Sequence, residues 1–528
     1  MHLPWLSLLI FLPLAGAVAL ALLPPTAHRT IRVLATAIAG VEFAISLPLW
    51  WRVVPQQPGW QFAEQREWLH SLGASYHLGV DGISMLLALL TTLLTLIAVI
   101  GSFTAVEKRA REFYALLLAL EAGMLGTFFS LDLLLFYVFW EAMLVPMYLL
   151  IGVWGGPRRI YAALKFFLYT MAGSVLMLVA ILWLYGMQRA ATGTPSFDLD
   201  AFYALAIPGG VQTWLFLAFA LAFAIKVPMF PLHTWLPDAH VEAPTAGSVI
   251  LAAVLLKMGT YGFVRFAMPL FPVASAHFAP WIAGLAIFGI LYGALVAMVQ
   301  PDLKKLVAYS SVSHLGFCML GLYALNSQGM AGGMLQMINH GISTGALFLL
   351  VGVIYERRHT RQISEFGGLW KTMPVYGAVF LVVMLSSIGL PGTNGFVSEF
   401  LVLLGAFRNE WSWAAFAALG VVLGALYMLW MFQRVMFGPL KNPANQRLAD
   451  LSLRERLVFV PLVALIFWIG FAPQPILDRA QPALERTMRL VERRAAMSID
   501  SHAALPGAVR VEGAIAGAAA APLGGERP

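Results

Sequence analysis

Apolar residues occur along this chain in runs of about twenty, the length that an α-helix needs to cross the hydrocarbon core of a bilayer. Fourteen such runs can be counted, at roughly 4–23, 31–51, 80–103, 113–130, 132–154, 160–186, 211–235, 244–271, 279–300, 303–325, 329–354, 373–408, 412–436 and 456–474. The pattern predicts an all-α, polytopic membrane protein of about fourteen transmembrane helices, with one transmembrane domain over residues 1–475.

The composition supports a membrane protein. Of the 528 residues, 60% are hydrophobic and 11% are charged, and the mean hydropathy is +0.80. Soluble domains carry nearer a quarter charged residues, and a large soluble helical core would need polar helix faces that these runs lack. The first run is too long for a cleaved signal peptide and has no basic flank, so we expect it to remain as the first helix.

The positions of the basic residues predict the topology. With the N-terminus outside, the inner loops hold nineteen lysines and arginines, whereas the outer loops hold four, Arg52, Arg66, Arg189 and Arg408. An excess of basic residues in the inner loops is the rule for membrane proteins. The formal charge of +7 therefore reflects topology and gives no indication of nucleic-acid binding. The single cysteine, Cys318, excludes an internal disulfide.

The runs also show a weak internal symmetry. Helices four to eight (about 113–271) and nine to thirteen (about 279–436) form two sets of five, and the odd number in each set makes the repeats inverted. Helices seven and twelve are interrupted by prolines, Pro228 and Pro231 in the first set and Pro391 in the second. Because proline frees the carbonyl four residues earlier, we expect free carbonyls at Ala224, Val227 and Ser387. Broken helices at matching places indicate an ion path in transporters, but two ordinary proline kinks explain the prolines alone equally well.

Ionisable residues inside these runs are the candidates for chemistry, because each costs at least about 2.5–3.5 kcal/mol at mid-bilayer. A structural salt bridge between Glu141 and Lys226 is the simpler alternative, but it leaves Lys257 and Glu399 without partners. Either His314 or His340, taken singly, could be an ordinary packing residue. Glu42 and Asp81 are interpreted as structural or as end-of-helix residues, and the role of Glu121 is left open. The predicted proton relay consists of Glu141, Lys226, Lys257, His314, His340 and Glu399.

These residue types suit proton transfer. Burial lowers the pKa of a lysine and raises that of a glutamate, which brings both toward neutrality, and histidine titrates near neutral pH without any shift. The spacing of His233 and His240 fits no helical metal motif, and an ordered loop is the preferred interpretation there. No CxxC, GxGxxG or P-loop sequence is present. Flavin, nucleotide and iron–sulfur binding are therefore not expected in this chain.

The C-terminal region differs from the rest. Residues 476–497 are predicted to form an amphipathic helix with Leu484, Met488, Val491 and Ala495 on one side and most of its arginines elsewhere. Such a helix lies on a membrane or on partner subunits. Residues 498–528 are rich in alanine and glycine and are predicted to be disordered.

Three segments resemble the antiporter-like subunits of respiratory complex I, the proton-pumping NADH:quinone oxidoreductase. They are FAIKVPMFPLHTWLPDAHVEAPTAGSVILAAVLLKMGTYGFVRF, DLKKLVAYSSVSHLGF and LPGTNGFVSEF. The resemblance covers at least helices three to thirteen. The acidic Glu399 and the length of the chain are most similar to the chain M or mitochondrial subunit 4 type.

The resemblance implies a role for each relay residue. Glu141 would control the charge of Lys226, the carrier of the inner half-channel. Lys257 and His314 would connect the two halves, and Glu399 would serve the outer half-channel with His340 nearby.

It also implies a non-redox subunit of an H⁺-translocating enzyme, with no cofactor of its own. NADH, FMN, iron–sulfur clusters and quinone are expected in partner subunits. The expected partners are neighbouring antiporter-like subunits in a bacterial inner (plasma) membrane. The alternative is a subunit of a multisubunit Na⁺/H⁺ antiporter or of a membrane-bound hydrogenase.

Overall fold

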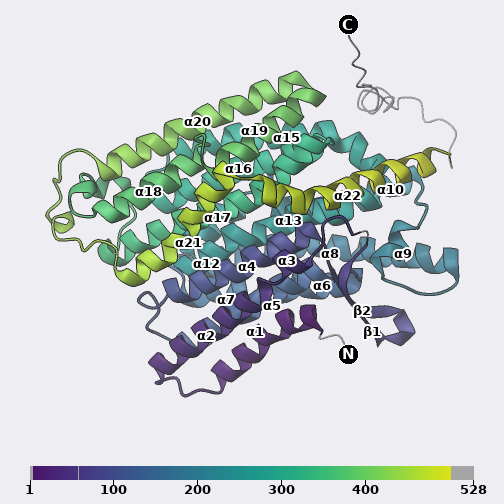
Figure 1. Cartoon of the computed structure of the whole chain (residues 1–528), viewed down its shortest axis with the longest axis horizontal. Helices are drawn as coiled ribbons and strands as arrows, with labels where there is room; N and C mark the ends of the chain where they lie inside the picture. Colours follow the sequence, from purple (N-terminus) through teal and green to yellow (C-terminus); the bar gives the residue numbers. More distant parts are fainter. Residues whose placement is uncertain (1–3, 58, 501–528) are drawn as a thin grey trace, which may run out of the picture.

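The computed structural model describes residues 4–57 and 59–500, and it is dominated by long helices packed side by side (Figure 1). The first eleven helices are α1 (Trp5–Ala21), α2 (His28–Ser46), α3 (Leu49–Arg52), α4 (Gly82–Gly101), α5 (Ala110–Phe129), α6 (Leu133–Ala142), α7 (Leu144–Trp154), α8 (Arg159–Thr192), α9 (Leu199–Tyr203), α10 (Gly209–Lys226) and α11 (Trp235–Glu242).

The second part of the chain is also helical. One span combines α12 (Thr245–Ile250), α13 (Leu256–Gly262) and α14 (Met268–Leu270), joined by π-helical turns at Leu251–Leu255 and Phe263–Ala267. It is followed by α15 (Pro272–Met298), α16 (Leu303–Tyr323), α17 (Ser327–Arg358), α18 (Pro374–Ser387), α19 (Asn394–Asn409), α20 (Trp411–Met436), α21 (Leu453–Phe471) and α22 (Gln474–Asp500). Short 3₁₀ turns occupy His70–Leu72, Ile363–Glu365, Leu369–Lys371 and Pro443–Asn445.

The prediction of a multi-span membrane protein is confirmed, but the count of fourteen is not. Within the described residues, eleven helices are long and apolar enough to cross a membrane, and up to twelve if the bent pair of α21 and α22 makes one span. Two of the predicted runs correspond to shorter apolar helices, α1 with 17 residues and α18 with 14. The inverted repeats remain a prediction.

The helices differ in what surrounds them. The span Thr245–Leu270 and α17 are buried on all sides, and α16 nearly so. By contrast, α8 and α20 expose large apolar side chains such as Leu168, Trp183 and Val422. A helix that is apolar all round and exposed on one side suits a lipid-facing position. The polar residues of the chain therefore concentrate on the innermost helices, where other helices shield them from lipid.

Both predicted interruptions are present. The first break lies between the end of α10 at Lys226 and the start of α11 at Trp235, and the second between the ends of α18 and α19 at Ser387 and Asn394. The expectation of a free carbonyl at Ala224 is wrong, because the chain turns back and the backbone N–H of Met229 donates to it at 2.9 Å.

The all-α prediction missed one feature. The predicted loop 52–79 contains an antiparallel hairpin of β1 (Gln61–Leu69) and β2 (Ala74–Val80), in which Gln61 pairs with Val80 and Leu69 with Ala74. Strand β1 carries four charged or amide side chains in sequence, so it lacks the clean alternation that signals a strand.

The C-terminal helix α22 runs lengthwise over one side of the bundle and packs on α4, α14, α15 and α17 (Figure 1). The predicted amphipathic segment 476–497 lies within it. Ile476, Ala480 and Leu484 are buried on its inner side. Of the tail predicted to be disordered, residues 498–500 belong to this helix, and residues 501–528 lie outside the described part of the chain.

Candidate functional site

Four of the six predicted relay residues form a line across four neighbouring helices. In α13, the ammonium Nζ of Lys257 lies 2.6 Å from Nδ1 of His340 in α17 and donates to the backbone carbonyl of Ala252 at 2.5 Å. The ring of His340 lies 5.9 Å from that of His314 in α16. Nδ1 of His314 is in turn 3.2 Å from Oε1 of Glu399 in α19. Lysine, two histidines and glutamate therefore follow one another without an intervening apolar residue.

This line is almost fully enclosed by protein. The exposed fractions are 0% for Lys257, 3% for His340, 8% for His314 and 5% for Glu399. A buried charge is tolerated only where polar groups or a counter-charge compensate it. Here the compensation comes from the line itself, since each member offers a group that can accept or donate a proton to the next.

Polar side chains surround the Glu399 end of the line. The amide of Gln336 lies 3.4 Å from Nδ1 of His314, and the same side chain accepts from Ser398 at 2.5 Å. A small cavity at this end is lined by His314, Gln336, Asn339, His340, Ser343, Thr344, Ser386, Ser387, Gly395 and Glu399. Nearly every one of these lining residues has a hydroxyl, amide, imidazole or carboxylate, so the cavity suits water and protons rather than an apolar ligand.

The second break shapes this cavity. Gly389 adopts a φ of +71°, and a Cβ atom there would lie 2.7 Å from Oε2 of Glu399. A Cβ atom on Gly395 would meet the backbone carbonyl of Ser386 at 2.1 Å. Glycine at these two positions therefore lets the broken helix fold back on itself and leaves room for the Glu399 carboxylate.

The other two predicted residues, Glu141 and Lys226, form a separate group. Lys226 is 1% exposed at the last turn of α10, and its Nζ lies 4.8 Å from the ring centroid of Trp140, the residue before Glu141. The indole Nε1 of Trp140 donates to Ser174 at 3.1 Å. Glu141 is half-buried and its charge interacts with that of Lys226. Neither Oε1 of Glu141 nor Nζ of Lys226 has a direct hydrogen-bond partner among the described residues.

Close helix packing connects the two groups, although no hydrogen bond or ion pair within the described residues joins Lys226 to Lys257. Two residues after Lys257, a Cβ atom on Gly259 would lie 2.7 Å from the carbonyl of Phe223 and 2.9 Å from the backbone N of Val227. The absence of a side chain at Gly259 therefore brings the backbone of α13 against the turn that carries Lys226.

His240 is a buried residue that the sequence interpretation assigned to an ordered loop. It lies in α11, is 0% exposed, and stacks on Phe348 with ring centroids 4.6 Å apart. Burial and the charges of Lys304 and Lys257 hold the pKa of His240 well below its usual range. The charges of both lysines therefore act on this imidazole. In the sequence, the only indication that His240 could be functional is its position close to the first helix break.

The neighbouring polar residues of that segment have separate partners. Asp238 accepts from Nζ of Lys165 at 2.7 Å, which ties α11 to α8. Glu242 accepts from the backbone N–H of Arg158 at 2.9 Å. In residues 4–57 and 59–500, no group of three or more His, Cys, Asp and Glu side chains converges so as to hold a metal ion.

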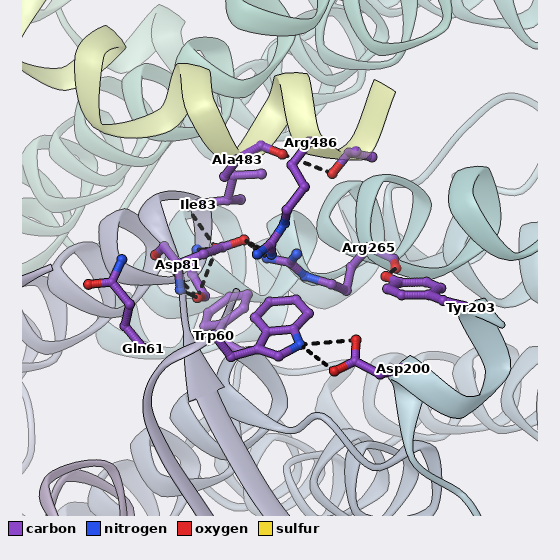
Figure 2. Close-up of polar contacts among 12 residues, drawn as sticks. Trp60, Gln61, Asp81, Ile83, Asp200, Tyr203, Arg265, Ala483 and Arg486 are labelled. Carbon is purple, nitrogen blue, oxygen red and sulfur yellow. Dashed lines mark hydrogen bonds and ion pairs between the residues drawn. The ribbon is translucent and has the colours of Figure 1, made fainter. Parts of the chain in front are cut away.

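Arg265, the third basic residue inside a span, is compensated directly. Figure 2 shows its guanidinium against Asp81, whose carboxylate accepts from Arg265 at 2.7 Å and from Arg486 of α22 at 3.4 Å. Asp81 also caps α4 by accepting from the backbone N–H of Ile83. Burial alone would raise the pKa of Asp81, but the two guanidinium groups hold it below its usual range. The structural interpretation of Asp81 agrees with these contacts.

Trp60 joins this ion cluster to the hairpin. Both guanidinium groups lie over its ring, that of Arg265 at 4.7 Å and that of Arg486 at 4.4 Å from the ring centroid, and its Nε1 donates to Asp200 (Figure 2). Farther along α22, Arg494 is 5% exposed and donates to the backbone carbonyls of Phe202, Tyr203, Leu205 and Leu270. The prediction placed most arginines of this helix away from its apolar side; Arg494 and Arg486 nevertheless bind groups of the bundle, Arg494 because irregular backbone near α9 offers carbonyls to bind.

The sequence and the fold of this chain are both similar to those of known proteins. Residues 130–426 match the model of the family described as NADH:quinone oxidoreductase/Mrp antiporter, TM. NADH-quinone oxidoreductase subunit M of Rhodobacter capsulatus is 49% identical over 491 residues, covering 91% of this chain and 95% of the relative. A chain of respiratory complex I from Thermus thermophilus has a TM-score of 0.83 at 35% identity, covering 93% of this chain and 99% of that one. A chain of the Mrp complex from Dietzia sp. DQ12-45-1b, 22% identical, has the same fold with a TM-score of 0.81, covering 94% of this chain and 100% of that one.

Proposed function

The chain belongs to the NADH:quinone oxidoreductase/Mrp antiporter transmembrane family, and we propose that it is the proton-translocating membrane subunit of an NADH:quinone oxidoreductase. Quinone reduction in other subunits drives the transfer, and NADH, FMN, iron–sulfur clusters and quinone are bound there. The proposal includes neighbouring antiporter-like subunits as partners, a bacterial inner membrane as the location, and an N-terminus on the outer side.

The observation that carries this proposal is the line Lys257–His340–His314–Glu399 through the centre of a lipid-facing bundle, in which the two histidine rings lie 5.9 Å apart and the outer pairs are in direct contact. Each step joins two groups that titrate, so a proton can pass directly at the two ends of the line and between the two histidine rings by way of a water molecule. Glu399 is the terminal acid, at the break between α18 and α19, where a polar cavity reaches it. An intramembrane ionisable group with such neighbours is the usual mark of a proton path.

Glu141 and Lys226 supply the control step in this proposal. Within the described residues Lys226 has no direct carboxylate partner, so its protonation responds to charges at a distance, and Glu141 of α6 is the carboxylate whose charge acts on it. When Glu141 is charged, Lys226 holds its proton, and when that charge is withdrawn, Lys226 releases the proton toward Lys257. His240 provides an entry from the opposite side.

A Na⁺/H⁺ antiporter subunit is the second candidate, because the Mrp complex has the same fold. Sequence identity favours the first candidate, since the Rhodobacter capsulatus oxidoreductase subunit is 49% identical and the Mrp chain 22%. Acidic residues that would hold a sodium ion do not converge in the described part of the line, where Glu399 is the one carboxylate.

The test replaces Lys257 by methionine, which is unbranched and only one atom shorter and has no amine to carry a proton. Purified complex is reconstituted in vesicles, and protons moved per NADH oxidised are measured with and without sodium. We expect Lys257→Met to lose most proton movement, and Lys441→Met, in an exposed loop, to match the parent. Normal proton movement in the Lys257 variant would contradict the proposal. Proton movement that depends on sodium would favour the antiporter instead.

A further inference from the structure

A second group of buried ionisable side chains lies in the first long helices, outside the line described above. Glu42 of α2 and Glu121 of α5 are each 0% exposed. None of their four carboxylate oxygens has a direct hydrogen-bond partner among residues 4–57 and 59–500. Figure 1 shows α2, α4 and α5 together in the N-terminal part of the bundle, and the three helices pack on one another.

The register of α2 against α4 places Glu42 beside Thr95. Ser46 Oγ of α2 and Thr92 Oγ1 of α4 are 2.8 Å apart. The two helices run in opposite directions, so one turn back along α2 corresponds to one turn forward along α4. Glu42 and Thr95 therefore face each other at the next level of the same interface.

The register of α2 against α5 places Glu121 at that level too. A Cβ atom on Gly16 would contact Ile38 of α2 and Leu118 of α5, so these two residues lie at one height. Glu42 and Glu121 follow them by about one turn each, in helices that run in the same direction. The two carboxylates are close enough for their charges to act on each other.

The hydroxyl of Thr95 is turned toward this pair. Thr91, one turn earlier, donates to the carbonyl of Leu87 at 2.7 Å, as threonines in helices commonly do. Thr95 is 0% exposed, makes no such bond to the described residues, and faces Glu121. Its hydroxyl is thus directed at the carboxylate of Glu121.

Within the described part of the chain, no cation acts on the pair from the surrounding helices. The two carboxylates interact with each other, and the other ionisable groups on the elements packed against α2 and α5 contribute nothing comparable. Helices α1 and α4 carry no ionisable side chain. The remaining elements carry His28, Arg29 and Arg32 on α2, Arg111, Glu112 and Tyr114 on α5, Tyr137 and Glu141 on α6, Tyr148 on α7, Lys257 and Tyr261 on α13, and Tyr76 and His77 on β2. Two carboxylates in this position cannot both ionise.

We propose that Glu42 and Glu121 form a proton-binding site, separate from the Lys257–Glu399 line, that holds at least one proton at neutral pH and exchanges it past Tyr114. Tyr114 precedes Glu121 by two helical turns, which puts it on the same face of α5 toward the end of the bundle predicted to be inner. Its hydroxyl is buried beside the guanidinium of Arg32. The inference goes beyond the proposed function, since it holds whichever residues carry the pumped protons.

The test is infrared difference spectroscopy of the purified complex, which detects the carbonyl stretch of a protonated carboxylic acid. The parent is compared with the double variant Glu42→Gln/Glu121→Gln, in which amides keep the volume and the neutrality of the acids. We expect the parent to show a protonated-acid band that the double variant lacks. We also expect this band to shift when the sample is moved into D₂O, and to shift more slowly in Tyr114→Phe.

Each other result counts against the proposal. An unchanged spectrum in the double variant means that the two acids are not protonated. A band that never shifts in D₂O means that the site is sealed, and a parental rate of shift in Tyr114→Phe removes the route past the tyrosine. A carboxylate band that responds to sodium in the parent alone identifies a monovalent-cation site instead. Glu399→Gln, measured for proton movement in parallel, tests the proposed function independently of these spectra.

Discussion

The two halves of the bundle hold an acid and a buried base in different ways. In the second half, His314 and Glu399 are in direct contact at 3.2 Å. In the first half, Lys226 lies over the ring of Trp140 and has no direct hydrogen bond to Glu141. The acid and the base are therefore joined in one half and separated in the other.

The difference bears on how each half responds to a change of charge. A proton moves readily between two groups in contact, whereas two groups held apart influence each other only through the electric field. A unit charge about 7 Å away at an effective dielectric of about 20 is worth roughly 2.4 kcal/mol. This is similar to moving one charge through ~100 mV of membrane potential. We infer that the first half is suited to switching and the second half to transfer.

Arg265 gives a third arrangement that sharpens this contrast. It is as deeply buried as Lys226, with exposed fractions of 2% and 1%. Arg265, however, is bound to Asp81 at 2.7 Å and cannot release its proton near neutral pH. Arg265, a buried cation with a purely structural role, is paired with a carboxylate. Lys226, which in our proposal must change its charge, has no carboxylate in direct contact among the described residues.

The largest expected effect comes from Lys226. Lys226→Ala removes the base that the first half holds apart, and we expect proton movement in vesicles to fall by about 10²-fold, the usual scale for loss of an acid–base group. Lys226→Arg should be nearly as poor, because arginine keeps its charge but does not release a proton. If the arginine variant moved protons at the parental rate, Lys226 would be a fixed counter-charge like Arg265.

Glu141→Gln should have the next largest effect, because it removes the charge that acts on Lys226 while changing little volume. We expect NADH oxidation coupled to quinone reduction in membranes to fall by roughly tenfold or more, in line with an interaction of about 2 kcal/mol. The abundance of the assembled complex should remain near normal and is measured on the same membranes. Normal turnover with normal proton movement would mean that the first half needs no switch.

Glu399 tests the joined acid and base of the second half. Glu399→Gln keeps the contact with His314 but cannot titrate, so we expect the number of protons moved per NADH to drop by about half or more. Glu399→Lys should retain part of the movement, since a buried lysine also exchanges protons. A parental proton count in the glutamine variant would remove Glu399 from the path and leave His340 as the next candidate for the exit.

Parts of this arrangement could be predicted from the sequence because they depend on local chemistry. The breaks after Lys226 and Ser387 follow from proline and glycine, whose effects on a helix are intrinsic. The membrane spans follow from the length of the apolar runs. The hairpin at residues 61–80 could not be read in this way, because its strands are stabilised by pairing rather than by a regular alternation of apolar side chains.

The contacts within the site could not be predicted, because they join residues that are distant in the chain. Lys257 and His340 are 83 positions apart, and their contact depends on how α13 and α17 pack. The same is true of Asp81 with Arg486. The sequence gives the residue types and their order, whereas partner choice depends on helix rotation, which one sequence does not reveal. The pairing of Glu42 with Glu121 was missed for this reason.

The smallest expected effect concerns the space beside Gly389 that the Glu399 carboxylate occupies. Gly389 has a φ of +71°, and a Cβ atom there would lie 2.7 Å from Oε2 of Glu399. Gly389→Ala should therefore move the carboxylate away from its position against His314. We expect a moderate fall in protons moved per NADH, smaller than that of Glu399→Gln, because the acid is still present.

Gly438→Ala is the matched control for this variant. Gly438 also has a positive φ, +87°, but nothing lies within 4 Å of the position that its Cβ would occupy. Both substitutions cost about 1–2 kcal/mol of backbone strain, so both should lower the melting temperature of the complex by similar amounts. Proton movement should fall in Gly389→Ala alone, because only there does the new methyl group contact the acid. An equal fall in both variants would show that strain rather than the position of Glu399 sets the effect, and the direct contact between His314 and Glu399 would then lose its assigned importance for transfer.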